Sequence, residues 1–111
     1  MTVQVSIRDG FAETLAPLGD LRQAVDTALR RYAIEQITTK VTDLRRRDQE
    51  FAGKYGCDYE AFKQRTARDA QFVSEVEMRI SKTWELDLAE WQFCPEGAQD
   101  WTERLQEILL Q

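Results

Sequence analysis

Residues 2–8 read Thr-Val-Gln-Val-Ser-Ile-Arg, and this alternation of apolar and polar side chains decides the expected fold. Side chains on a β-strand point alternately to opposite faces, so one row would be buried and the other exposed. A single strand needs partners, and the chain has no second segment of comparable pattern. The sequence therefore predicts a strand over about residues 2–8 that pairs with the same strand of a second copy, in a homodimer.

The remainder of the chain has the pattern of helices. Apolar residues follow helical spacing from residue 21 to residue 55, which predicts a long helix over about residues 20–55. Asp20 can cap its N-terminus, with Gln23 completing a capping box. Gly56 suits the left-handed position that ends many helices. We therefore expect a mainly α protein with one short N-terminal strand.

The second half of the chain predicts two further helices. Asp58 can cap a helix over about residues 58–93, with a possible break near residues 81–83. Pro95 and Gly97 then interrupt the pattern, because proline removes a hydrogen bond from a helix interior. The last helix is expected over about residues 98–110.

Composition favours elongated helices that need partners. The chain has 111 residues, of which 42% are hydrophobic and 32% are charged. Residues 1–55 carry nine Lys and Arg against eight Asp and Glu, whereas residues 56–111 carry six against twelve, a net charge of −6. An acidic half of this kind indicates either a basic partner or a solvated face.

Residue types argue against catalysis. The chain has no histidine, so it lacks the usual general base and a common metal ligand. Cys57 lies beside a predicted helix N-terminus, which can lower a thiol pKa, but no base or second cysteine accompanies it. We expect no catalytic residue, no metal site and no cofactor. No apolar run could span a membrane, and a cytoplasmic location is expected by default.

The N-terminal pattern resembles the ribbon-helix-helix repressors of the Arc and MetJ type. In that family two strands pair across a dimer and enter the DNA major groove. The resemblance implies that Gln4, Ser6 and Arg8 read operator DNA. Their chemistry suits this role, because glutamine can pair with adenine, arginine with guanine and serine with either base. The alternative is a ribbon that only joins two copies.

Two further segments are similar to antitoxins of type II toxin–antitoxin pairs. Residues 21–32 resemble the helix that follows the strand in many of them, and residues 51–62 resemble their F-x-x-x-Y-G…F segment. The resemblance implies a dimerising, DNA-binding segment, here residues 1–55, and a region that blocks a toxin, here residues 56–111. The toxin is often a small basic ribonuclease, which suits an acidic second half.

Aromatic residues are the candidate anchors for that partner. Trp84 and Trp91 are seven residues apart and so share a helix face. Together with Phe72 and Trp101 they form the predicted partner-binding set, since aromatic anchors on a helix recur at interfaces. The alternative is that they pack within the chain or between protomers.

The expected function is an antitoxin-like regulator that binds operator DNA and neutralises a toxin. The competing expectation is a non-enzymatic helical dimer or scaffold that binds no DNA.

Overall fold

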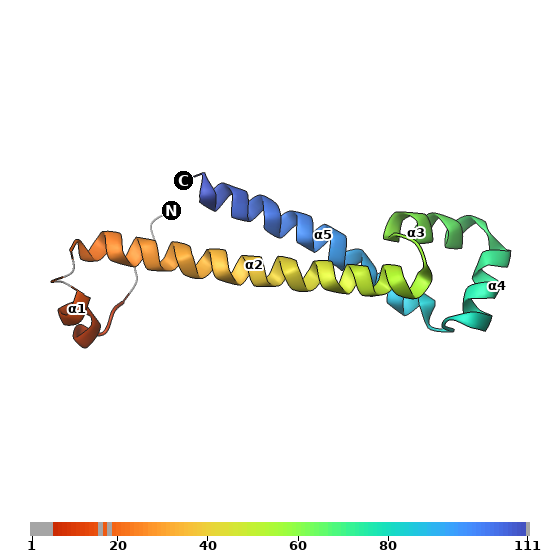
Figure 1. Cartoon of the computed structure of the whole chain (residues 1–111), viewed down its shortest axis with the longest axis horizontal. Coiled ribbons are helices and arrows are strands. Elements are labelled where there is room, and N and C mark those ends of the chain that lie inside the picture. The colour runs from red at the N-terminus through yellow and green to blue at the C-terminus, as the bar shows by residue number, and fades with distance from the viewer. Residues whose placement is uncertain (1–5, 16, 18, 111) are drawn as a thin grey trace. The chain divides into compact units, whose positions relative to one another are not determined.

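The computed structural model describes residues 6–15, 17 and 19–110 (Figure 1). The chain divides into two compact units, residues 1–35 and 36–111. The long second helix begins in the first unit and ends in the second. The described residues form five α-helices: α1 (Asp9–Leu15), α2 (Leu21–Tyr55), α3 (Tyr59–Arg68), α4 (Ala70–Arg79) and α5 (Trp84–Leu109).

The predicted N-terminal strand is wrong, while the mainly helical class is confirmed. None of the described residues lies in a strand, residues 6–8 included, and residues 2–5 lie outside the described residues. The carbonyl of Arg8 accepts from the N–H groups of Phe11 and Ala12, at 3.0 and 3.1 Å, and so starts α1. An alternating segment without a partner strand leaves its backbone polar groups unpaired, so the pattern alone could not establish a strand.

The start of α2 in the first unit agrees with the prediction. Gly19 has φ +135°, a conformation that L side chains rarely adopt, and Asp20 follows it. A side-chain oxygen of Asp20 accepts from the N–H of Arg22 at 2.9 Å. Its carbonyl accepts from the N–H of Ala24, also at 2.9 Å. Asp20 therefore caps α2.

The apolar stripe of α2 is not continuous. Ile37 and Val41 are buried, whereas Leu29 and Tyr32 are largely exposed. An α-helix turns by about 100° per residue, so Tyr32 and Ile37 point about 140° apart. The stripe predicted from residue 21 to residue 55 thus consists of two stripes on different faces, and only the second is buried in the core.

Within the second unit, α2 and α5 run antiparallel (Figure 1). A set of buried and half-buried side chains on each helix is spaced alternately three and four residues apart, as in coiled coils. On α2 these are Ile37, Val41, Leu44, Asp48, Phe51 and Tyr55, and on α5 they are Trp84, Asp87, Trp91, Cys94, Ala98, Trp101, Leu105 and Ile108.

The core lies where α3 and α4 meet this pair of helices. Trp91 and Phe62 are fully buried, with their ring centroids 5.5 Å apart. Phe51, Tyr55 and Tyr59 also contact the Trp91 ring, at centroid distances of 5.6, 6.0 and 5.8 Å. Aromatic side chains bury the largest apolar areas, so this cluster supplies much of the stability of the unit.

Local capping sets the boundary between α2 and α3 as predicted. Gly56 has φ +74°, and its N–H donates to the carbonyl of Ala52 at 2.8 Å. The Asp58 side chain accepts from the N–H of Ala61 at 2.8 Å. These two residues end one helix and begin the next.

The single helix predicted over residues 58–93 is divided in the structure. Asp69 ends α3 and begins α4, because its side chain accepts from the N–H of Phe72 at 3.1 Å. A second break follows α4, and Thr83 stands at the N-cap position of α5 without a side-chain capping hydrogen bond. Only this second break was anticipated, although an aspartate preceding an apolar turn is a capping signal.

The predicted helix end at Pro95 and Gly97 is also wrong, because both residues lie inside α5. Proline removes one backbone hydrogen bond, but apolar contacts on either side of Pro95 keep the helix continuous. Gly97 serves close packing: a Cβ atom there would lie 3.1 Å from Leu44 Cδ1. The separate helix expected over residues 98–110 is therefore the second half of α5.

Candidate partner-binding surface

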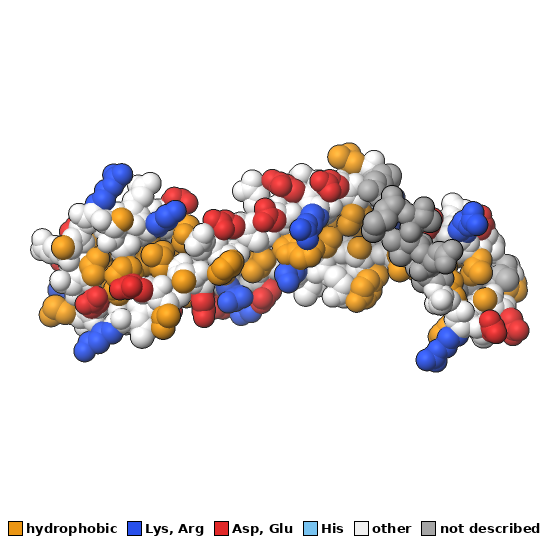
Figure 2. Space-filling model, turned by 180° about the vertical axis from the view of Figure 1, so that it is seen from behind, with side chains coloured by type: hydrophobic (Ala, Val, Ile, Leu, Met, Phe, Trp, Pro, Cys, Tyr) orange, Lys and Arg blue, Asp and Glu red, His pale blue; other side chains and the backbone are white. Residues whose placement is uncertain are grey.

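The negative charge of the second half is concentrated on one helix. Helix α5 carries seven Asp and Glu residues and one basic residue, Arg104, for a net charge of −6. Residues 56–83 carry five acidic and five basic residues, so α5 accounts for the whole excess. Figure 2 shows acidic side chains along the part of the surface that α5 forms.

Six of these seven carboxylates point to solvent. The exposed residues are Glu85, Glu90, Glu96, Asp100, Glu103 and Glu107. We call this set the acidic face of α5. The Arg47 guanidinium on α2 lies 4.0 Å from the Glu90 carboxylate. Six exposed carboxylates outnumber Arg47 and Arg104, so the acidic face keeps a net negative charge.

The seventh carboxylate, Asp87, faces inward and fixes α5 against α2. It accepts from Lys54 Nζ at 2.7 Å and from the Tyr55 hydroxyl, and its side chain is 19% exposed. Burial alone would raise the pKa of Asp87, but the hydrogen bonds from Lys54 and Tyr55 outweigh it and lower that pKa. Burial, and then the Asp87 carboxylate, raise the pKa of Tyr55. Asp87 is therefore a positioning residue.

A second polar contact holds the middle of α5. The indole Nε1 of Trp91 donates to Asp48 Oδ1 on α2 at 2.5 Å. A buried indole N–H normally needs an acceptor, and this one selects the register of the two helices. The side of α5 opposite the acidic face is therefore held against α2 by Asp87 and Trp91.

Large apolar side chains interrupt the acidic face. Leu86 and Phe93 are 68% and 69% exposed, and exposed Ala89 lies between them. We call these three residues the α5 ridge. These residues lie outside the apolar stripe that predicts the buried side of the helix, so that stripe did not reveal them. The available signal was a pair of large apolar residues seven positions apart and outside that stripe.

A groove adjoins the α5 ridge between α3 and α5. It has a volume of about 480 Å³. Figure 2 shows hydrophobic side chains gathered at the end of the unit where α3 and α4 lie. The apolar lining of this α3–α5 groove comes from Tyr59, Ala67, Trp84, Leu88 and Ala89, and its charged residues are Lys63 and Glu85.

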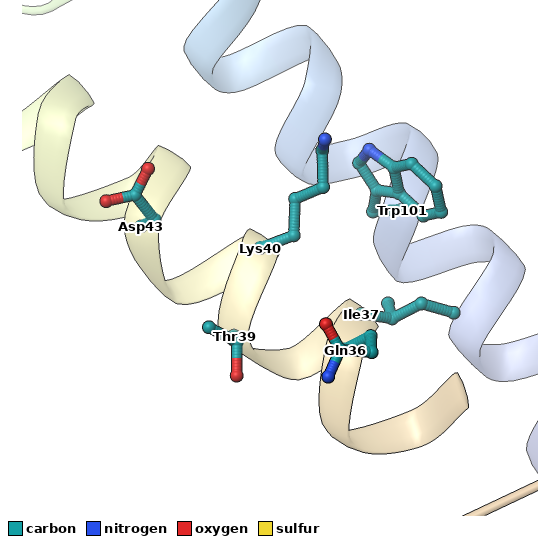
Figure 3. Close-up of a pocket in the computed structure, with 6 residues that line it drawn as sticks. All are labelled: Gln36, Ile37, Thr39, Lys40, Asp43 and Trp101. Carbon is teal, nitrogen blue, oxygen red and sulfur yellow. The ribbon is translucent and has the colours of Figure 1, made fainter. Parts of the chain in front are cut away.

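Another depression, of about 420 Å³, lies around Trp101 on the α2–α5 seam (Figure 3). Ile37 and Trp101 line it, and the Lys40 side chain extends toward the indole, with Nζ 5.3 Å from the ring centroid. The Arg104 guanidinium lies 4.6 Å from the same ring. The half-buried Trp101 ring thus engages two cations within its own unit.

The other predicted anchors differ in accessibility. Trp91 is fully buried among side chains of its own unit. Trp84 is half-buried and donates to Glu77 at 3.0 Å. Phe72 is half-buried beneath Arg65, whose guanidinium lies 3.8 Å from the ring centroid. A partner-binding role for Phe72, Trp84, Trp91 and Trp101 stays a prediction.

No family identifies this chain. Comparisons with protein-family models, with curated proteins and with solved structures find no match.

The predicted DNA-reading residues are not brought together on a strand. Ser6 and Arg8 are exposed in irregular backbone before α1, and Gln4 lies outside the described residues. Arg8 uses its carbonyl to start α1. Base reading needs the three side chains on one face of a strand, and residues 6–8 do not form a strand.

The cysteines have ordinary structural environments. Burial raises the pKa of the Cys57 thiol, and the positive charge of Arg65 only partly offsets this. Burial likewise raises the pKa of Cys94. Among the described residues, no three His, Cys, Asp or Glu side chains are close enough together to hold a metal ion. None of the helices that these residues form has the length and apolar character needed to cross a membrane.

Proposed function

We propose that this chain is a non-enzymatic binding protein that captures and neutralises a basic partner protein through α5, as antitoxins do. The observation that carries the proposal is the concentration of the net charge of −6 on α5, with six exposed carboxylates. A surface of one sign accelerates association with a partner of the opposite sign and disfavours partners of the same sign.

The anchoring of α5 supports the proposal. Asp87 and Trp91 fix the inward side of the helix to α2, so the acidic face is ordered before binding. A preorganised surface loses less conformational entropy on association than a mobile one. The similarity of residues 21–32 and 51–62 to antitoxin segments favours the same function. Operator binding through residues 2–8 is not part of the proposal, because it depends on the strand.

The test uses the product of the gene adjacent to the one that encodes this chain. We expect that product to arrest growth when expressed alone, and to form a stable complex with this chain when the two are co-expressed. Replacing Glu96→Lys and Glu103→Lys together should weaken the complex at least about tenfold at low salt, because the partner is basic.

The matched control places the same charge change on other helices. Glu60→Lys with Glu75→Lys alters two exposed residues on α3 and α4, and affinity should change far less. Raising the salt concentration should reduce the difference between the two double variants. Absence of a complex with the wild-type chain, or equal loss in both variants, would refute the proposal.

A second candidate function is a helical scaffold that associates with copies of itself. The exposed side chains of Phe11, Leu29 and Tyr32 in the first unit favour it, because self-association would remove them from water. Light scattering should then give a dimer mass that Leu29→Lys with Tyr32→Lys reduces to that of a monomer. A monomer at all concentrations of the wild-type chain would exclude this function.

A further inference from the structure

The α5 ridge and the α3–α5 groove form one continuous apolar surface inside the acidic face. Ala89 belongs to both: it lies between Leu86 and Phe93 on the ridge, and it lines the groove. Its methyl group is small, so a partner backbone can approach α5 closely at this point. Leu86 and Phe93 are seven residues apart and therefore lie about 10.5 Å from each other along the helix axis.

Carboxylates surround this apolar surface on α5. Glu90 follows Leu86 by four residues and precedes Phe93 by three, which places it beside both on the helix surface. Glu96 follows Phe93 by three residues, and Glu85 lines the groove. The only cation lining the groove, Lys63, lies over the Tyr59 ring with Nζ 5.9 Å from its centroid. The surroundings therefore complement a basic segment with an apolar stripe.

We infer that the partner docks a basic amphipathic helix across Ala89. One apolar side chain of that helix fills the α3–α5 groove, and Leu86 and Phe93 pack against its other side. This is the groove-binding mode in which apolar anchors repeat at helical spacing. Its basic residues face Glu85, Glu90 and Glu96. The inference rests on the proposed function and names the element of the partner that α5 recognises.

The direct test introduces a bulky side chain at the centre of the docking surface. Ala89→Trp should weaken binding of the adjacent gene's product by on the order of tenfold or more, because the indole occupies the path of the partner helix. Ser74→Trp on α4 is the control, since residue 74 is also exposed but lies outside this surface. Circular dichroism should show unchanged helicity in both variants.

A second variant tests the apolar anchors without adding bulk. Leu86→Ala with Phe93→Ala should weaken binding by a similar factor, whereas Met78→Ala, which also truncates an exposed apolar side chain, should not. The loss of affinity in the double variant should persist at high salt, because salt screens interactions between charges and not apolar contacts. The effect of Glu96→Lys with Glu103→Lys should shrink under the same conditions.

The outcomes separate the docking surface from the function. If Ala89→Trp and the double alanine variant both bind like the wild type while the charge reversal weakens binding, the docking inference is overturned and the proposed function stands. If the wild-type chain forms no complex with the adjacent gene's product, both are overturned.

Discussion

Trp91 shows at the residue scale how one side chain joins the parts of the second unit. It lies on α5, contacts rings from α2 and α3, and donates its indole N–H to Asp48. Its complete burial means that substitution leaves a cavity as well as lost apolar contact.

Trp91→Ala should therefore lower the free energy of unfolding by about 3–5 kcal/mol. Urea unfolding followed by circular dichroism measures this. The control is Trp101→Ala, which removes the same side chain from a half-buried position and should cost clearly less. Equal losses at the two positions would contradict the assignment of Trp91 to the core.

Asp87 makes stability depend on pH at the acidic end. Its pKa is lower in the folded chain than the ordinary value of 3.8, so the unfolded chain binds the proton first as the pH falls. The stability that Asp87 contributes is fully present above its unfolded pKa and is lost as the pH falls through the folded pKa.

Asp87→Asn should consequently lower the free energy of unfolding near neutral pH. The gap between the unfolding free energies of the variant and the wild type should narrow below about pH 4. Urea unfolding of both proteins at a series of pH values gives the gap directly. Asp100→Asn, at an exposed carboxylate of α5, is the control and should show no such narrowing. A gap that stays constant down to about pH 2 would contradict the role given to Asp87.

At the element scale, two glycines near the end of α2 have different roles. One occupies the helix interior and the other terminates the helix. Gly53 lies inside the helix, and Gly56 lies just beyond it with φ +74°. An added Cβ atom meets nothing within 4 Å at either position, so packing does not confuse the comparison.

Gly53→Ala should raise the free energy of unfolding by about 0.5–1 kcal/mol, because alanine favours the helix interior. Gly56→Ala should lower it by about 1–2 kcal/mol, because a Cβ atom strains the left-handed conformation. Changes of the same sign in the two variants would show that Gly56 does not terminate α2 in this way.

The whole molecule consists of two units, and the buried cluster belongs entirely to the second. Tyr55, Tyr59, Phe62, Val76, Trp91 and Cys94 all lie within residues 36–111. A unit with its own core can fold alone. We expect a fragment of residues 36–111 to be helical and to unfold cooperatively, with a urea midpoint close to that of the full chain. A fragment that unfolds without a cooperative transition would show that residues 1–35 are needed for folding.

The sequence by itself determined the helix boundaries that depend on local capping. Asp20, Gly56 and Asp58 act as predicted, because their hydrogen bonds reach only two to four residues along the chain. The break at Asp69 is equally local, because its capping hydrogen bond reaches only three residues along the chain to Phe72.

Only the tertiary structure decided which apolar residues are buried and where a helix continues through proline. Pro95 and Gly97 remain helical because α2 packs against α5 there, and a second helix is not visible in local sequence. The same packing buries Trp91 and leaves Leu86 and Phe93 on the surface. The strand predicted from the alternating pattern of residues 2–8 is wrong for a related reason. A strand is stable only beside a neighbouring strand, and the pattern does not show whether such a neighbour exists.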